Sequence, residues 1–403
     1  MGAIVPAPDH DQTIDLQQQV FRLQALLEAS RQVHATIREE EVLESVLRIV
    51  VRELEMAGAT FPGTGLSHGS GVEDGQEPEI SPGNGNGAAR TSLFRFPLND
   101  RDGRRMAELV VAPPGDRELT IYETDFLEGL ALQAAVALEN ARNHKRNVEY
   151  ARVQQDLDSA RAIQRSLLPQ HLPDIPGYTV GFRSATCYEV GGDYLDILEL
   201  PDRSVVMAVA DVAGKGLASA MMSTSFRSAF RAMAVGATPL DELATRMNQH
   251  QWLEGEEARR RYVTAIFLRL YPERGEMEFV NAGHNPGFVI HADGSRWEIE
   301  SSGTPLGLLP GMQYTMEHGA FPPGSRLLFY TDGLTEAFCG DEEFGPERLW
   351  DNFSRCEALK ADGILDALWT AIQSFVKGGP QGDDMTALVL CRKAGKPVME
   401  PAA

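Results

Sequence analysis

The chain contains 403 residues, with 58 acidic and 37 basic side chains and a formal net charge of −21. This charge repels the phosphates of nucleic acids and of anionic lipid surfaces, so we expect neither nucleic acid nor a membrane as a partner. The hydrophobic content of 43% is ordinary for a globular protein, and the length exceeds that of a typical single domain. The composition therefore predicts two domains and a connector.

The cysteine pattern and the apolar runs bear on the cellular location. The four cysteines are far apart and form no CxxC pair: Cys187, Cys339, Cys356 and Cys391. They indicate reduced thiols rather than a disulfide framework or a zinc site. No stretch approaches about 18 apolar residues, and the first residues lack the basic and apolar regions of a secretory signal. We therefore expect a cytoplasmic protein.

The first part of the chain alternates helical and strand-like patterns. Apolar spacing over residues 14–57 predicts two helices. Residues 60–90 are rich in Gly, Pro, Ser and Asn, which predicts a flexible insertion. Strand-like runs at residues 93–98 and 106–112 flank the turn at residues 99–103, which predicts a hairpin.

A long helical pattern follows, from about Thr120 until Pro169 ends it. Nearly 50 residues without a breaker exceed an ordinary globular helix, so we expect a coiled-coil or signalling helix. The apolar spacing weakens over residues 143–150, where a kink or a break is expected. We place a helical linker at residues 141–170.

Helices that flank a small hairpin-containing sheet, followed by a long exit helix, resemble a GAF-type sensory domain. The segment ETDFLEGLALQAAVALENAR is similar to the closing helix of that family. The Gly-rich stretch falls where such domains usually build a ligand pocket, so we do not expect a cyclic nucleotide there. The resemblance implies a small α/β domain over residues 1–140 that either senses a signal or serves for dimerisation.

Beyond Pro169 the patterns change to strands with helices grouped between them. Strands are predicted at residues 178–186, 194–200, 204–212, 263–271, 277–281, 287–291, 297–300, 314–319, 326–331 and 385–392. Helices are predicted at residues 217–235, 239–252, 346–357 and 361–376. This order predicts an α+β sandwich over residues 171–394, with helices on both outer faces of paired sheets, and a disordered tail at residues 395–403.

Four aspartates stand where a strand pattern meets a glycine or a turn: Asp193, Asp211, Asp332 and Asp383. Turn chemistry explains any one of them, because Asp-Gly is a favoured turn pair, but it explains the repetition poorly. Carboxylates at neighbouring strand ends suit a hard cation, and oxygen ligands alone favour Mg²⁺ or Mn²⁺ over zinc. Two such ions about 3.5–4 Å apart would activate a water for in-line attack on a phosphoester.

Seven segments, in the same order as in the family, resemble the type 2C metal-dependent protein phosphatases, in the bacterial branch typified by SpoIIE and RsbU. They are ARAIQRSLLP, YEVGGDYLD, ADVAGKGLASAMM, VNAGHNPG, GTPLGLLP, LLFYTDGLTEA and GDDMTALV. The resemblance runs from about Asp156 to Arg392. It implies an αββα sandwich with a binuclear Mn²⁺ or Mg²⁺ centre.

The resemblance also implies which residues serve that centre. It implies that the metal ligands are the side chains of Asp193, Asp211, Asp332 and Asp383 and the backbone carbonyl of Val212. The four aspartates are also the expected catalytic residues. Asp211 would bridge the two ions. Three further residues are expected to support these ligands: Asp384, Gly192 and Gly333.

Several residues near these segments are harder to assign. Ala213 stands where the eukaryotic enzymes carry a histidine, so a metal-bound water or another group must protonate the leaving group. Arg183 is a guess for the phosphate-binding arginine. His284 is better explained as a structural histidine of a turn. Lys215 lacks the rest of the GxxxxGK[ST] phosphate loop, so nucleotide binding is not expected.

The resemblance implies hydrolysis of phosphoserine or phosphothreonine on a regulatory protein. By analogy the substrate is a STAS-domain anti-anti-sigma factor, and the N-terminal domain controls the enzyme, with the linker as a lever on the helix at residues 217–235. A homodimer through the linker helices is expected. Two alternatives stay open: a catalytically inactive scaffold of the same fold, and a hydrolase of small phosphoesters.

Overall fold

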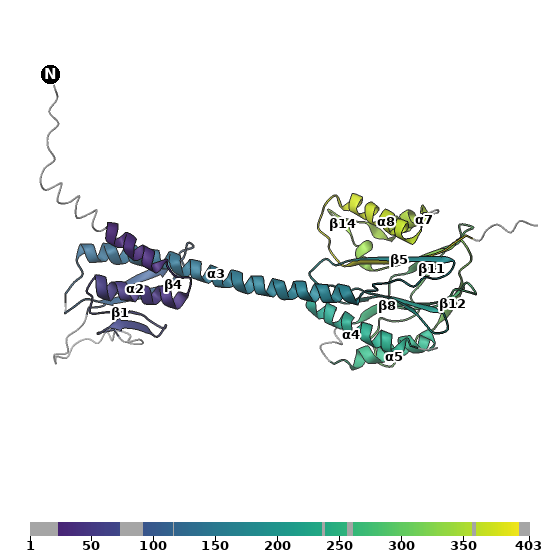
Figure 1. Ribbon diagram of the computed structural model, residues 1–403, viewed down its shortest axis with the longest axis horizontal. Coiled ribbons are helices and arrows are strands. Elements are labelled where there is room, and N and C mark those ends of the chain that lie inside the picture. Colours follow the sequence, from purple (N-terminus) through teal and green to yellow (C-terminus); the bar gives the residue numbers. More distant parts are fainter. Residues whose placement is uncertain are drawn as a thin grey trace, which may run out of the picture. The chain divides into compact units, whose positions relative to one another are not determined.

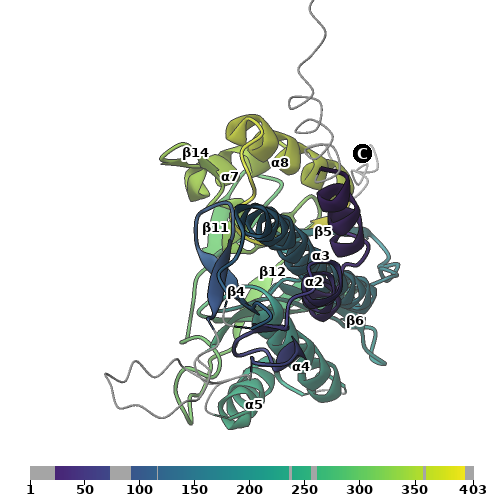
Figure 2. The same cartoon turned by 90° about the vertical axis from the view of Figure 1, so that its left-hand side faces the viewer.

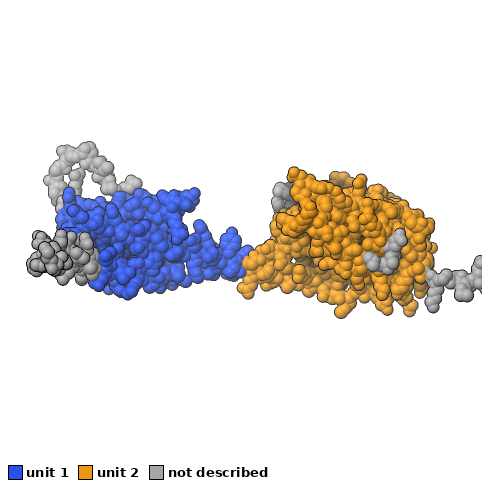
Figure 3. Space-filling view, turned by 90° about the horizontal axis from the view of Figure 1, so that it is seen from above, with its two compact units in different colours: residues 1–153 blue, residues 154–403 orange. Residues whose placement is uncertain are grey.

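The computed structural model describes residues 23–72, 92–115, 117–235, 238–255, 261–356 and 360–394 (Figure 1). The chain divides into two compact units, residues 1–153 and residues 154–403 (Figure 3). The division falls inside helix α3 (Ile121–Leu167). Among the described helices, none has the length and apolar character needed to cross a bilayer.

The first unit is built on a four-stranded antiparallel sheet in the order β2-β1-β4-β3. The strands are β1 (Gly58–Phe61), β2 (Leu66–Gly69), β3 (Phe94–Asn99) and β4 (Arg105–Ala112). Helix α2 (Glu39–Glu53) has a buried apolar face that shares a core with the sheet and with the first turns of α3. The hairpin of β3 and β4 confirms the sequence prediction.

Strands β1 and β2 differ from the prediction, because β1 ends in, and β2 lies wholly within, the segment expected to be a flexible insertion. Gly58 pairs with Gly69 across the two strands. A Cβ atom on Gly69 would lie 2.2 Å from the Ala57 carbonyl oxygen, so the glycine permits the two strands to pair closely. The high glycine content, which predicted a flexible segment, therefore belongs in part to a strand pair. The rest of the expected insertion, residues 73–91, and the expected tail at residues 395–403 lie outside the described residues.

Helix α3 begins where the sequence predicted, at a reciprocal cap. The Glu123 amide donates to the Thr120 hydroxyl, and the Thr120 amide donates to the Glu123 carboxylate. The helix then runs without interruption for 47 residues, so the kink or break expected at residues 143–150 is absent from the described helix. That segment contains no Gly or Pro. Its weak apolar spacing reflects solvent exposure rather than a break.

The second unit contains two five-stranded antiparallel sheets. One has the order β11-β10-β13-β16-β5, from β11 (Arg296–Ile299), β10 (Gly287–Ile290), β13 (Arg326–Tyr330), β16 (Met385–Arg392) and β5 (Tyr178–Ala185). The other has the order β12-β9-β8-β7-β6, from β12 (Glu317–Ala320), β9 (Glu276–Ala282), β8 (Val263–Tyr271), β7 (Val205–Val212) and β6 (Tyr194–Glu199). Buried apolar side chains of both sheets form the core between them.

Two pairs of helices cover the outer faces of the sandwich. Figures 1 and 2 show α4 (Leu217–Met233) and α5 (Leu240–Leu253) beyond one sheet, and α7 (Gly345–Ser354) and α8 (Ala361–Val376) beyond the other. Each pair has its own buried cluster against its sheet. The predicted αββα sandwich is confirmed. The 3-10 helix η1 (Asp332–Leu334) and the short strands β14 (Phe338–Cys339) and β15 (Glu342–Glu343) were not predicted.

Candidate metal centre

The strand register brings the predicted aspartates to one end of the sandwich. Strand β6 starts directly after Asp193, and its first residue pairs with Ala210, the neighbour of Asp211 on β7. In the facing sheet, β13 ends two residues before Asp332, and β16 starts just after Asp383 and Asp384. Because Tyr330 pairs with Ala387, these two ends also lie side by side. Each sheet therefore contributes carboxylates to the same end.

A cavity of about 240 Å³ opens at this end of the sandwich. Its described lining residues are mostly polar: Asp211, Ala213, Gly214, Lys215, Tyr262, Thr264, His284, Asn285, Asp332 and Asp383. Three of the four predicted aspartates thus face one space. Asp193 is not part of this lining; it is buried, and it lies close enough to Asp211 for the charge of Asp211 to raise its pKa.

Burial and mutual repulsion disturb these carboxyl groups. Burial, together with the charges of Asp332 and Asp383, raises the pKa of Asp211 to about 7. Burial and the charges of Glu336 and Asp383 raise the pKa of Asp332 to about 6. The pKa of Asp193 lies well above its ordinary range, because the group is buried beside Asp211. A bound divalent cation would relieve this repulsion.

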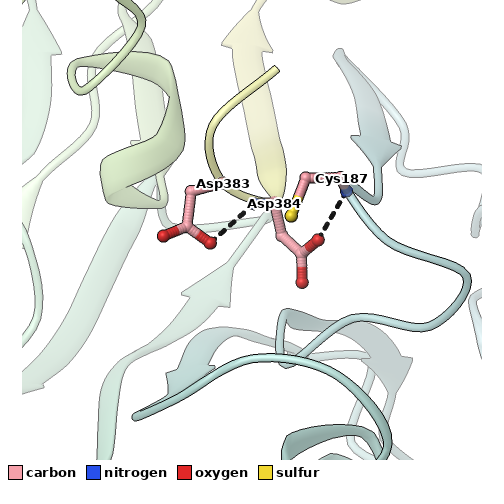
Figure 4. Close-up of side chains that lie close together, drawn as sticks. All are labelled: Cys187, Asp383 and Asp384. Carbon is pink, nitrogen blue, oxygen red and sulfur yellow. Dashed lines mark hydrogen bonds between the residues drawn. The ribbon is translucent and has the colours of Figure 1, made fainter. Parts of the chain in front are cut away.

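Asp384 has a different environment from its neighbour Asp383. Its two carboxylate oxygens accept hydrogen bonds from the backbone amides of Cys187 (2.8 Å) and Gly192 (2.7 Å). Figure 4 shows the Asp384 carboxylate directed toward Cys187, while the Asp383 carboxylate points elsewhere. Asp384 therefore fixes the loop that precedes Asp193.

Two glycines allow the chain segments of the site to approach one another. A Cβ atom on Gly333 would lie 2.0 Å from the Asp384 carbonyl oxygen. A Cβ atom on Gly192 would lie 3.0 Å from the Val212 carbonyl oxygen and 3.4 Å from an Asp211 carboxylate oxygen. A side chain at either position would push away the neighbouring backbone or carboxylate atoms of the cluster.

Lys215 is a member of the site that sequence reasoning set aside. Its ammonium group lies 2.8 Å from the Asp383 carboxylate and donates to the Gly382 carbonyl at 2.7 Å. The absence of the GxxxxGK[ST] pattern argues against nucleotide binding only. It does not bear on the contact between Lys215 and Asp383, which are 168 positions apart in the sequence.

Arg183 lies elsewhere, so the guess that it binds phosphate is wrong. Its guanidinium group stacks over the ring of Trp369 at 5.0 Å and pairs with Asp366 at 3.1 Å, both on α8. The alternation of β5 turns this side chain toward the helices rather than toward the cavity.

His284 is buried and held by its surroundings. Its Nδ1 atom is 2.8 Å from the Thr264 hydroxyl, and its backbone amide donates to the Asn281 side chain. Burial lowers the pKa of the ring to about 4, so His284 is neutral at pH 7. These contacts fit the expected structural role.

The chemistry of the donors fits a hard divalent cation. The oxygen donors that line the cavity are three carboxylates, the hydroxyls of Tyr262 and Thr264 and the side-chain amide of Asn285, beside the Lys215 ammonium group and the His284 ring. The nearby Cys187 thiol has its pKa raised to about 11 by burial and by Asp384 and Asp383, so it stays protonated and is a poor ligand. Oxygen-rich sites of this kind favour Mg²⁺ or Mn²⁺.

The fold of the second unit is that of the PP2C phosphatases. The SiaA-PP2C domain of Pseudomonas aeruginosa superposes with a TM-score of 0.54 at 21% sequence identity, over 60% of this chain and 97% of that domain. Residues 201–393 match the family model of stage II sporulation protein E (SpoIIE). The chain therefore contains a SpoIIE-family PP2C phosphatase domain, which confirms the resemblance drawn from the seven segments.

The chain is also similar to two curated proteins. Protein IcfG of Synechocystis sp. is 27% identical over 263 residues, which cover 59% of this chain and 41% of IcfG. Phosphoserine phosphatase RsbP of Bacillus subtilis is 26% identical over 185 residues, which cover 45% of either chain. The chain thus spans less than half the length of these relatives. The GAF resemblance of the first unit stays a prediction.

Proposed function

We propose that this chain is a metal-dependent protein serine/threonine phosphatase. The observation that carries the proposal is the convergence of Asp211, Asp332 and Asp383 on one cavity, with Asp193 buried beside Asp211, in a domain of the SpoIIE family. In a catalytically inactive scaffold nothing would offset the mutual repulsion that raises the pKa of Asp211 and Asp332, whereas bound cations would offset it. The name of RsbP, a phosphoserine phosphatase, supports the same activity.

The metal centre of the proposed enzyme holds two Mn²⁺ or Mg²⁺ ions. The chain would bind them through Asp193, Asp211, Asp332, Asp383 and the carbonyl of Val212. Bound ions lower the pKa of a coordinated water and neutralise charge on the phosphoryl group. The protein's own contribution is to hold the carboxylates in place, through Thr331, whose hydroxyl donates to Asp193 at 2.8 Å, and through the loop contacts of Asp384.

The proposed substrate is a phosphoserine or phosphothreonine of a regulatory protein, with a STAS-domain anti-anti-sigma factor as the favoured partner. That partner rests on the family resemblance alone. A homodimer through α3 has support from the helix itself. Val148, Tyr150 and Val153 are more than half exposed on it, and exposed apolar side chains on a long helix suit a helical partner.

Control by the first unit would act through the last turns of α3, which touch the site. Arg161 donates to the backbone carbonyls of Glu189 (2.6 Å) and Tyr188 (3.2 Å), in the loop before Asp193. At the end of the helix, the Leu167 carbonyl accepts from Arg227 on α4 at 3.0 Å. A change in the position of α3 would therefore shift both the metal-binding loop and α4.

The test is hydrolysis of p-nitrophenyl phosphate, a phosphoserine peptide and a phosphothreonine peptide by the full chain, with Mn²⁺, with Mg²⁺ and with a chelator. We expect turnover of the phosphopeptides that needs the metal and that the chelator abolishes. Turnover of small phosphoesters alone would favour the small-molecule hydrolase. A folded, metal-loaded protein that leaves the peptides and a mixture of cellular phosphoproteins untouched would favour the inactive scaffold.

A further inference from the structure

The charges that face the cavity are unbalanced in sign. Its described lining includes three carboxylates and a single cationic side chain, Lys215. His284 also lines it but is neutral, because burial lowers its pKa to about 4. A phosphomonoester brings about two negative charges into this space, so a cationic side chain that reaches the cavity would strengthen its binding.

Lys215 is presented by a fixed loop between β7 and α4. Gly214 and Gly216 have φ values of +102° and +79°, at which a residue with a side chain would be strained. The Ala213 amide donates to the Tyr262 carbonyl at 2.9 Å, and the Ala213 carbonyl accepts from Arg261 at 3.3 Å. The backbone that carries the lysine is therefore held in place, while the lysine side chain is 45% exposed.

The ammonium group reaches across to the other sheet. Two of its three N–H donors have partners among the described residues, the Asp383 carboxylate and the Gly382 carbonyl. Within the described part of the chain the third donor has no partner, and since Lys215 lines the cavity, that donor is open to a ligand there. Both partners lie just before β16, so the side chain links the loop after β7 in one sheet to the start of β16 in the other.

Two arginines of this domain, Arg183 and Arg261, are less suited than Lys215 to meet a phosphate. Arg183 packs on Trp369 of α8 and is outside the lining. Arg261 lies against Gly214, where a Cβ atom would be 2.2 Å from its guanidinium nitrogen, and it too is outside the lining.

We propose that Lys215 is a phosphate-binding residue of this site, donating a hydrogen bond to an oxygen of the substrate phosphoryl group. The inference rests on the proposed phosphatase function. It adds a contact to the substrate that a side chain of the protein makes, in addition to those that the metal ions would make. Lys215 then has two roles: it restrains Asp383, and it supplies a localised positive charge in the lining of the cavity.

The experiment compares Lys215→Met and Lys215→Arg with the wild-type full chain. The matched control is Arg183→Met, which removes a positive charge from the same domain outside the cavity. The measurements are kcat and KM for p-nitrophenyl phosphate, the inhibition constant of inorganic phosphate, and Mn²⁺ affinity by calorimetry without substrate.

We expect Lys215→Met to raise KM and the inhibition constant of phosphate by about tenfold or more, the usual effect of losing a charged hydrogen bond. Lys215→Arg should restore part of that loss, since it keeps the charge in a different shape. Mn²⁺ affinity should change by less than about threefold, which corresponds to less than about 0.7 kcal/mol. Arg183→Met should match the wild type.

Unchanged phosphate inhibition in Lys215→Met would overturn the inference, as would an equal loss in Arg183→Met. A fall in Mn²⁺ affinity and kcat with KM and phosphate inhibition unchanged would also overturn it, because Lys215 would then act only on Asp383. Absence of turnover in the wild type counts against the proposed function instead. In that case calorimetric binding of inorganic phosphate to the Mn²⁺-loaded wild type and Lys215→Met still decides the role of Lys215.

Discussion

Gln164, near the end of α3, exchanges two hydrogen bonds with the backbone of Gly191. Its Oε1 atom accepts from the Gly191 amide at 3.1 Å, and its Nε2 atom donates to the Gly191 carbonyl at 2.7 Å. Gly191 stands two residues before Asp193, in the loop that Asp384 also holds through Gly192. The helix and the candidate metal ligand are therefore connected through one short segment of backbone.

We expect Gln164→Ala to lower kcat about tenfold at saturating Mn²⁺, because two hydrogen bonds of about 1 kcal/mol each no longer hold the loop before Asp193. Gln154→Ala is the matched control, since Gln154 lies on the same helix and makes only an exposed 3.4 Å contact with Glu189 of the same loop. Steady-state hydrolysis by both variants is the measurement. Equal rates for Gln164→Ala and the wild type would show that the contact does not influence the site.

Asp211→Asn should reduce metal-dependent hydrolysis by at least about 100-fold and weaken Mn²⁺ binding, because the amide keeps the shape of Asp211 but lacks its charge. Asp293→Asn makes the same chemical change in an exposed turn, where Asp293 accepts hydrogen bonds from Ser295. Calorimetric titration with Mn²⁺ and hydrolysis assays test both variants. Normal Mn²⁺ affinity in Asp211→Asn would exclude this carboxylate as a ligand.

The raised pKa values predict how stability depends on pH when a chelator removes the metal. The pKa of Asp211 is raised to about 7 and that of Asp332 to about 6, both above the ordinary value of about 3.9. A carboxyl group with a raised pKa stabilises the folded state below its ordinary pKa, and this contribution is lost as pH rises through the folded value. The free energy of unfolding of the second unit should therefore fall between pH 5 and pH 8.

Urea denaturation from pH 5 to pH 8 measures that dependence, with chelator or with Mn²⁺. Asp211→Asn should flatten the curve in chelator, because the amide does not titrate. Mn²⁺ should raise stability most at the upper end of the range, where the carboxylates are ionised. A wild-type curve in chelator that rises from pH 5 to pH 8 would contradict the prediction.

Much of this site could be predicted from the sequence, because strand patterns and aspartates at their ends are local features. Asp332 and Asp383 are 51 positions apart in the sequence, yet each stands next to a strand that the apolar pattern revealed. The contacts of Gln164 and Lys215 could not be predicted, since they depend on which loops the sandwich brings together. Arg183 was misjudged for a related reason: the pattern located β5 but did not show which face meets α8.

Gly333→Ala should lose nearly all activity, because its Cβ atom would lie 2.0 Å from the Asp384 carbonyl oxygen and separate η1 from the start of β16. Backbone atoms of two elements cannot yield as a flexible side chain does. Gly382→Ala is the control in the same region, since a Cβ atom there meets nothing within 4 Å. Hydrolysis rates and circular dichroism distinguish a local effect from unfolding. Wild-type activity in Gly333→Ala would contradict the packing argument.

Asp196, the second aspartate of GGDYLD, anchors α4 rather than facing the cavity. Its fully buried carboxylate pairs with Arg231 of α4 at 2.6 and 2.8 Å and accepts from the Tyr194 hydroxyl at 2.6 Å. Asp196→Ala removes the shared partner of Arg231 and Tyr194, between α4 and β6. Because both groups then lose their hydrogen bonds to a buried carboxylate, the free energy of unfolding should fall by about 3 kcal/mol.

Asp241→Ala is the control for that loss, because Asp241 lies in the first turn of α5 and is only half-buried. Its removal should cost less than about 1 kcal/mol. Urea denaturation of the metal-loaded chains is the measurement, and hydrolysis is followed in parallel. If Asp196→Ala keeps wild-type stability, the pair with Arg231 contributes little to the fold. If it keeps stability but loses activity, α4 depends on this anchor for its position over the site rather than for its folding.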